Sequence, residues 1–366
     1  MFKKIRRLHG LMKELELPRK GWKLSKRASA AAKEEYPIDF VVTWVDGNDP
    51  EWRKEKAKYE KEAGMEGNIA ARYRDWELLR YWFRMVERYA PWVHRVYFVT
   101  CGHVPSWLNE ECPKLEIIKH SDYMAEEYLP TFSSIPIELN LWRIKDLSEH
   151  FVYFNDDTFL TRHVTPETFF ENGLPRYCAV AKPLDNYGLY SAFQHELFSN
   201  LGIINRDFSI RDCMEKHPEK WFSYRYGEDV IYNIQAYRDR CLTGIYFTHL
   251  ACPYRKTPFE AVWKKHFERL DWTCRHRFRS GMDVMHQLFQ LWDICSGDFS
   301  PVPRNYYGTA PVRMSREAVE SVLKEENIFV CLNDNELLTD QDYIELKNYC
   351  IQRLESKFHE KSIFEK

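Results

Sequence analysis

Two adjacent aspartates, Asp156 and Asp157, follow a run of aromatic and β-branched residues, "FVYF" at 151–154. This run is typical of a buried strand, and Asn155 joins the two aspartates at its end. Neighbouring carboxylates of this kind are suitable ligands for Mg²⁺ or Mn²⁺, which proteins often hold together with the phosphates of a substrate. The alternative is a polar turn whose side chains bond nearby backbone amides, and from these three residues alone the turn is the more common case.

A second acidic cluster occurs near residue 46. Asp46, Gly47 and Asp49 lie in "WVDGNDP", directly after the strand-like run "IDFVVT". Like Asp156 and Asp157, these two carboxylates are either metal ligands or parts of a polar turn. Gly47 permits either a close approach of the backbone to a ligand or a simple turn.

A histidine and a group of arginines supply further chemistry. His249 lies in "YFTHLACPYRK" after another strand-like run, and a histidine can act as a general base because it titrates near neutral pH. Arg279 belongs to the basic segment 275–283, "RHRFRSGMD", and guanidinium groups match phosphate oxygens in geometry. A structural histidine and a solvated basic turn are the alternatives. Neither a "GxxxxGK[ST]" loop nor a "GxGxxG" loop is present.

The elements that must position these residues alternate between strand and helix. Strand-like runs occur near 38–45, 94–100, 115–120 and 151–155. Helical patterns begin near Glu51 and Asp75, and a third covers about 135–149. Such alternation indicates an α/β body with a mostly parallel, Rossmann-like sheet. Because open α/β sheets bind ligands outside the carboxyl ends of their strands, the polar clusters are expected along one edge.

The second half of the chain is richer in helical patterns. These patterns cover 227–240, 258–270 and 281–295, and the strand-like run "NIFVCLNDNEL" precedes a last helix from about Gln341. We therefore expect an α/β sheet followed by a helix-rich C-terminal half.

Composition indicates a globular protein, since 44% of the 366 residues are hydrophobic and 16% are aromatic. The sequence has no run of 18 apolar residues and no apolar signal segment at its start, which predicts a cytoplasmic protein. None of the ten cysteines forms a CxxC pair, and most stand in apolar or mixed segments. This usage favours reduced, packed thiols over disulfides or a zinc site.

The first 35 residues are strongly basic, with eleven Lys or Arg against four Glu, which leaves a charge of +7. Five apolar residues recur three or four positions apart and form one helical face: Phe2, Ile5, Leu8, Met12 and Leu15. A basic amphipathic helix can lie on an anionic membrane surface, and the alternative is a solvated or docked helix. We expect residues 1–36 to be a separate segment before a catalytic body at 37–366. Nucleic acid is not an expected partner, because the basic excess does not continue into the body.

Taken in series, these segments resemble the Stealth family of sugar-phosphate transferases. The first conserved region of the family resembles 38–52 and the second resembles 72–160, where "YAPWV", "PSWLN", "LPTFSS" and "YFNDD" follow one another. The third is similar to 249–296 and the fourth to 327–360, which contains "VCLNDN". The short chain lacks the spacer and regulatory domains of the animal enzyme of the family and resembles its compact bacterial members.

The resemblance implies a sheet of the glycosyltransferase A type and the transfer of a sugar-1-phosphate from a nucleotide sugar to a hydroxyl group of a glycan or lipid-linked acceptor, in capsular or exopolysaccharide biosynthesis. It implies catalytic roles for the following four residues: Asp156, Asp157, His249 and Arg279. The two aspartates would hold Mg²⁺ or Mn²⁺. Substrate-binding positions implied in the same way are Asp46, Gly47, Asp49, Arg74, Arg80, Asn155, Asn333, Asp334 and Asn335.

Two other classes of protein remain as alternatives. A nucleotide-sugar glycosyltransferase would also place carboxylates after a strand, but its acceptor attacks the sugar carbon and nucleoside diphosphate leaves. A non-catalytic carbohydrate-binding module would use exposed aromatic residues and would show no turnover.

Overall fold

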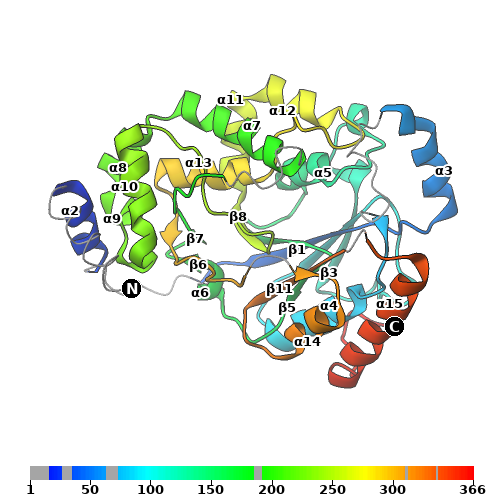
Figure 1. The fold of residues 1–366 in the computed structure, drawn as a ribbon. Coiled ribbons are helices and arrows are strands. Elements are labelled where there is room, and N and C mark those ends of the chain that lie inside the picture. Colours follow the sequence, from blue (N-terminus) through cyan, green and yellow to red (C-terminus); the bar gives the residue numbers. More distant parts are fainter. Residues whose placement is uncertain (1–15, 27–34, 63–72, 185–191, 310–311, 335–336) are drawn as a thin grey trace.

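A five-stranded sheet forms the centre of the protein in the computed structural model (Figure 1). The structure describes residues 16–26, 35–62, 73–184, 192–309, 312–334 and 337–366. The strands of the central sheet are β1 (Ile38–Trp44), β2 (Val96–Thr100), β3 (Leu115–Lys119), β4 (His150–Asn155) and β8 (Cys252–Arg255). Their order is β3-β2-β1-β4-β8, with β1 to β4 parallel and β8 antiparallel to β4 at one edge. The predicted mostly parallel α/β sheet is therefore confirmed.

Alternating side chains of the central strands enter two separate cores. In β1, Phe40 and Val42 pack into one core while Val41 packs into the other. In β4, Phe154 enters the first core and Tyr153 the second. This division follows from the two-residue period of a strand, and it explains why the parallel strands read as continuous apolar runs.

Helices cover both faces of the sheet, as Figure 1 shows. One face is covered by α4 (Leu79–Tyr89), α14 (Arg316–Leu323) and α15 (Asp340–Lys357). The other face is covered by α5 (Ser134–Asn140), α7 (Ala192–Asp207), α11 (Lys256–Lys265), α12 (Phe267–Cys274) and α13 (Gln287–Ser296). Together with α15, four of these helices, α7, α11, α12 and α13, confirm the predicted helix-rich C-terminal half.

The remaining elements extend this body. The other helices are α2 (Glu16–Ser25), α3 (Pro50–Tyr59), α6 (Pro166–Phe169), α8 (Ile210–Lys216), α9 (Pro218–Trp221) and α10 (Val230–Asp239). The other strands are β5 (Thr158–Leu160), β6 (Phe170–Glu171), β7 (Leu174–Tyr177), β9 (Ser300–Pro301), β10 (Val312–Arg313) and β11 (Phe329–Asn333). They form two small sheets with the orders β10-β11-β5 and β6-β7-β9.

Several predicted elements differ from those observed. The helix expected from Asp75 begins at Leu79, because Glu77 has a φ of 57° and this left-handed conformation cannot belong to an α-helix. The helix expected at 135–149 ends at Asn140 and continues only as a short 3₁₀ turn. The pattern at 258–270 spans two helices, since His266 (φ −122°, ψ 31°) interrupts the helical backbone between α11 and α12.

The strand predicted before His249 is absent from the described chain. Residues 245–248 have no regular secondary structure, and β8 begins after the histidine, at Cys252. The apolar character of this segment arises from packing, because Ile245 is buried and Tyr246 and Phe247 pack against the core.

Part of the basic N-terminal segment is folded onto the body. Helix α2 packs against α9, and Leu17 and Trp22 contact the core on the α7 side of the sheet. Gly21 permits this contact, because a Cβ atom there would lie 2.1 Å from the backbone oxygen of Pro218. The predicted apolar face from Phe2 to Leu15 lies outside the described residues. Within them, no helix combines the length and apolar character that crossing a bilayer requires.

The C-terminal residues complete the core around α4. Arg84 on α4 makes a bidentate ion pair with Glu365, with both nitrogen–oxygen distances 2.8 Å, and a second pair with Glu355 at 2.8 Å. Arg80, one turn earlier, lies 3.5 Å from the same Glu365 and stacks over Trp107. Arg80 therefore contacts the C-terminal segment, and the structure does not bring it to the cluster of predicted site residues.

Candidate active site

The loops after β1 and β4 meet where the strand order reverses. From β1 the chain adds β2 and β3 on one side, and then returns to add β4 on the other. Thr43 and Asn155 are paired across the two strands. The segment with Asp46 and the pair Asp156 and Asp157 therefore leave the sheet side by side. This switch point is where open α/β sheets bind their ligands.

Asp157 is held between two sheets. The turn formed by Asp156 and Asp157 leads directly into β5, which pairs antiparallel with β11, and the backbone oxygen of Asp157 accepts a hydrogen bond from the amide of Leu332 at 2.8 Å. Its carboxylate Oδ2 lies 3.5 Å from Nε2 of His249. Asn155 Nδ2 lies 3.2 Å from the same nitrogen. Residues far apart in the sequence thus converge on one carboxylate.

The electrostatics of Asp157 and His249 are those of a paired acid and base. Burial opposes ionisation of Asp157, but the attraction of His249 and hydrogen bonds from His249, Cys331 and Thr158 lower its pKa. Burial also opposes protonation of His249, and the charge of Asp157 outweighs it and raises the pKa of the imidazole. Asp157 therefore remains a carboxylate in the site and fixes the orientation of His249.

Asp156 lies in an excess of negative charge. Its side chain is exposed at the turn, yet desolvation by the surrounding protein and repulsion from Asp157 and Asp75 raise the pKa of Asp156 to about 8. Desolvation and the charge of Asp46 likewise raise the pKa of Asp75. A divalent cation would relieve this repulsion, and oxygen ligands of this kind fit Mg²⁺ or Mn²⁺.

A buried polar network supports the site from the side of α5. The Tyr153 hydroxyl lies 2.6 Å from Asn155 Oδ1 and 3.1 Å from Glu138 Oε1. Arg279 donates a hydrogen bond to Ser134 Oγ at 2.9 Å, so α5 holds its guanidinium. Its charge partly opposes the rise in the pKa of His249 that Asp157 causes.

The cluster around Asp46 is organised mainly by backbone contacts. Asp46 Oδ1 accepts a hydrogen bond from the amide of Asn48 at 2.8 Å, and Asp49 caps α3 by accepting one from the amide of Trp52 at 2.7 Å. A Cβ atom on Gly47 would lie 1.7 Å from the backbone oxygen of Tyr73. Asp49 is thus observed as a helix cap and Gly47 as part of a turn, while the charge of Asp46 also acts on Asp75.

The last predicted region reaches the site from β11. Asp334 lies 3.6 Å from Arg74, which joins the second and fourth predicted regions. Asn333 ends β11 and is exposed. Asn335 lies outside the described residues, so its predicted contact stays a prediction.

Sequence patterns missed three residues of this site. Asp75 adds a carboxylate, Glu138 contacts Tyr153, and Cys331 contacts Asp157. A sequence signal exists only for Asp75, because it directly follows Arg74, a predicted substrate-binding residue. Glu138 and Cys331 belong to elements that only the fold brings to β4.

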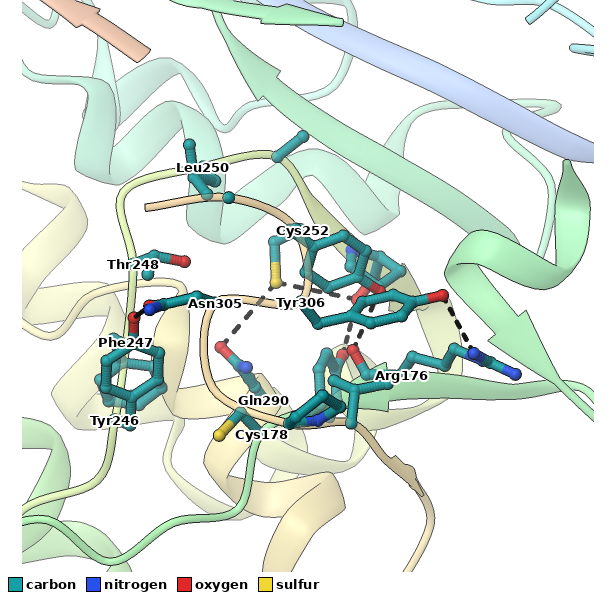
Figure 2. Close-up of a pocket in the computed structure, with 17 residues that line it drawn as sticks. Arg176, Cys178, Tyr246, Phe247, Thr248, Leu250, Cys252, Gln290, Asn305 and Tyr306 are labelled. Carbon is teal, nitrogen blue, oxygen red and sulfur yellow. Dashed lines mark hydrogen bonds between the residues drawn. The ribbon is translucent and has the colours of Figure 1, made fainter. Parts of the chain in front are cut away.

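A small pocket lies next to the segment that carries His249 (Figure 2). Thr248 and Leu250 line it, together with aromatic residues such as Tyr306, whose hydroxyl accepts a hydrogen bond from Arg176 at 3.0 Å. Asp156, Asp157 and His249 are not among the lining residues. Its cavity volume is about 50 Å³. The pocket is therefore separate from the proposed site of chemistry.

Comparison with known proteins identifies the chain. Residues 36–64 match the family model "Stealth protein CR1, conserved region 1", and residues 72–177 match "Stealth protein CR2, conserved region 2". The capsular polysaccharide phosphotransferase WcwK of Streptococcus pneumoniae is 43% identical over 330 residues, which cover 90% of this chain and 99% of WcwK. The chain belongs to the Stealth family. The third and fourth regions of this Stealth protein, at 249–296 and 327–360, stay predictions from the sequence.

Other Stealth relatives carry similar names. The exopolysaccharide phosphotransferase cps2G of Lactiplantibacillus plantarum is 35% identical over 335 residues, covering 90% of this chain and 97% of cps2G. The receptor polysaccharide phosphotransferase WefC of Streptococcus gordonii is 40% identical over 270 residues, covering 72% of this chain and 79% of WefC. A crystal structure of the galactosyltransferase LgtC with donor and acceptor sugar analogues matches with a TM-score of 0.36 at 12% identity, covering 85% of this chain and 95% of LgtC. At this TM-score the likeness carries no functional argument.

Proposed function

We propose that this Stealth transferase moves a sugar-1-phosphate from a nucleotide sugar to a hydroxyl group of a glycan acceptor, with release of nucleoside monophosphate, in capsular or exopolysaccharide biosynthesis. The observation that carries the proposal is the convergence of Asp156, Asp157 and His249 at the switch point of the sheet. The phosphotransferase names of its Stealth relatives support it.

The residues of the site fit the needs of this reaction. An acceptor hydroxyl attacks phosphorus, so a base must take its proton and positive charge must face the phosphate oxygens. His249 takes the proton, because Asp157 and Asn155 orient its ring. Arg279 neutralises phosphate charge from the position that α5 fixes. The sugar–oxygen bond stays intact.

Asp156 and Asp157, with Asp75 and Asp46 nearby, would hold Mg²⁺ or Mn²⁺. Desolvation and the neighbouring carboxylates raise the pKa values of Asp156 and Asp75, and this supports the assignment because a cation would stabilise the charged forms of both groups. When bound, such an ion neutralises the diphosphate of the donor and the charge that develops on the leaving phosphate. Arg74, whose guanidinium lies 3.6 Å from the carboxylate of Asp334, is the further donor contact in this proposal.

The released nucleotide distinguishes the proposal from glycosyl transfer. With a panel of nucleotide sugars and a glycan acceptor, the purified protein is expected to release nucleoside monophosphate and to form a phosphodiester, detectable by ³¹P NMR. Release of nucleoside diphosphate would instead establish attack at the sugar carbon. Sugar binding without turnover for any donor would favour the non-catalytic alternative.

We also propose that the enzyme works at the inner face of the plasma membrane on a lipid-linked acceptor. Arg19, Lys20 and Lys23 of α2 and Lys26 directly after it are exposed although the helix is docked. Further basic residues precede them in the sequence. Basic residues near an anionic bilayer contribute about 1 kcal/mol each, and salt screens them.

Replacing Arg6 and Arg7 by Ser is expected to weaken binding to vesicles that contain anionic phospholipid by roughly 30-fold, the equivalent of about 2 kcal/mol. Co-sedimentation with anionic and with neutral vesicles measures the effect. The matched control replaces Lys54 and Lys58, two exposed lysines of α3, by Ser. An equal loss of binding in both double variants, or no loss in either, would contradict the membrane role of the N-terminal segment.

A further inference from the structure

Three potential metal ligands of different chemistry meet beside the acidic pair. One ligand atom from each of Asp157, His249 and Cys331 lies within 4.8 Å of the other two. They come from the turn after β4, the bend before β8 and strand β11, so no sequence spacing links them. The cysteine usage predicted packed thiols without a zinc site, and only the fold reveals this cluster.

The set combines one oxygen, one nitrogen and one sulfur ligand. Mg²⁺ takes oxygen ligands, whereas Zn²⁺ is bound by Cys, His and Asp with bonds of about 2.0–2.3 Å in tetrahedral geometry. Bonds of that length place neighbouring ligand atoms about 3.3–3.8 Å apart. The 3.5 Å between Asp157 Oδ2 and His249 Nε2 already falls in this range. The sulfur lies within 4.8 Å of both atoms, about 1 Å at most beyond this range.

The backbone around the three ligands is rigidly placed. Cys331 is 1% exposed and pairs across the sheet with Thr158, the residue after Asp157. The amide of Leu332 donates a hydrogen bond to Asp157. Asn155 contacts the imidazole of His249. These contacts hold all three residues in place before any ion arrives. Metal binding therefore costs little further conformational entropy.

We propose that a thiophilic divalent cation, with Zn²⁺ as the reference ion, binds to Asp157, His249 and Cys331 and inhibits the enzyme reversibly. The thiol releases its proton to solvent as the metal–sulfur bond forms, and water takes the fourth position. The inhibition rests on the proposed function, since the ion would occupy both the general base and one carboxylate of the Mg²⁺ or Mn²⁺ site. The binding itself does not depend on that function.

Cobalt tests the binding without any assay of activity. Co²⁺ added to the purified full chain is expected to produce the near-ultraviolet charge-transfer absorption of a cobalt–thiolate bond, and added Zn²⁺ is expected to remove it. The variant Cys331→Ser should lose the absorption. The control Cys101→Ser should keep it, although Cys101 Sγ lies 3.5 Å from His103 Nδ1 and could itself attract a metal.

The wild-type chain decides the question even where a Cys331 variant fails to fold, because no cobalt–thiolate absorption in wild type would overturn the proposal. Equal absorption in wild type and folded Cys331→Ser would overturn it as well. In the activity assay with Mg²⁺, the Zn²⁺ concentration for half inhibition should rise at least about tenfold in Cys331→Ser, since each lost ligand weakens the site. A protein that binds cobalt through Cys331 but forms no phosphodiester would contradict the proposed function and leave the metal site standing.

Discussion

Replacing Asp157 by Asn is expected to abolish phosphodiester formation while the protein remains folded. The substitution keeps the side-chain volume but removes the charge that faces His249 at 3.5 Å and the proposed cation. Asn can still accept the hydrogen bond of Thr158, so we expect little change in the midpoint of thermal unfolding. The loss of phosphodiester formation is measured as activity with saturating donor and acceptor. The unchanged stability is measured by a thermal unfolding curve.

Asp156→Asn is the matched comparison, because it removes a neighbouring carboxylate of the same turn. We expect this variant to lower activity only by weakening the binding of the cation, because it leaves the contact between Asp157 and His249 in place. Chelation of divalent ions should also reduce wild-type activity, and Mg²⁺ or Mn²⁺ should restore it. Activity that survives exhaustive chelation would disprove the metal role. Two active Asn variants would show that the pair forms only a polar turn.

The substitution His249→Ala is expected to lower turnover by about 10²- to 10⁴-fold, the usual contribution of a general base. Donor affinity should change little, because the proposed phosphate contacts come from Arg279 and the acidic edge. Turnover and donor binding are measured separately, by initial rates and by calorimetry. Near-normal turnover would show that His249 has a structural role beside Asp157.

The pH dependence provides a second test of the same base. His249 must be neutral to accept a proton, and Asp157 raises its pKa, so activity should fall as the pH drops through a value above that of an ordinary histidine. In Asp157→Asn the stabilising charge is gone, and the pKa of His249 should move down. NMR titration of the imidazole in both proteins measures the shift, and an unchanged pKa would contradict the pairing.

The sequence predicted the parts of the site that follow directly from a strand. Asp156 and Asp157 form the turn directly after β4, and the apolar run before them is long enough to identify a buried strand. The same reasoning placed Asp46 after β1, and parallel strands then bring both turns to one edge. Local pattern and topology agree here, so the position of both turns at one edge of the sheet follows from the sequence, while the roles of the aspartates stay predictions.

Other parts required tertiary contacts that no local pattern records. The segment before His249 looks like a strand because it packs on the core, yet the edge strand β8 begins only after it. Cys331 reaches Asp157 through a second, antiparallel sheet. Arg80 shares its helix with core residues, and its orientation toward Glu365 depends on a segment almost three hundred positions later. Tertiary packing determines the structure of the segment before His249, and contacts between distant parts of the sequence determine the positions of the Cys331 and Arg80 side chains.

The ion pair between Arg84 and Glu365 also has a consequence for how the protein is made. Residues 38–155 supply four strands of the sheet, but the guanidinium buried beneath them has no carboxylate until residues 355–365 have been synthesised. A buried charge that lacks its partner costs about 3–5 kcal/mol. On the ribosome the early strands can collapse, yet they cannot settle into their final packing. Residues 355–365, which are translated long after these strands, therefore decide when the first third of the described chain becomes native.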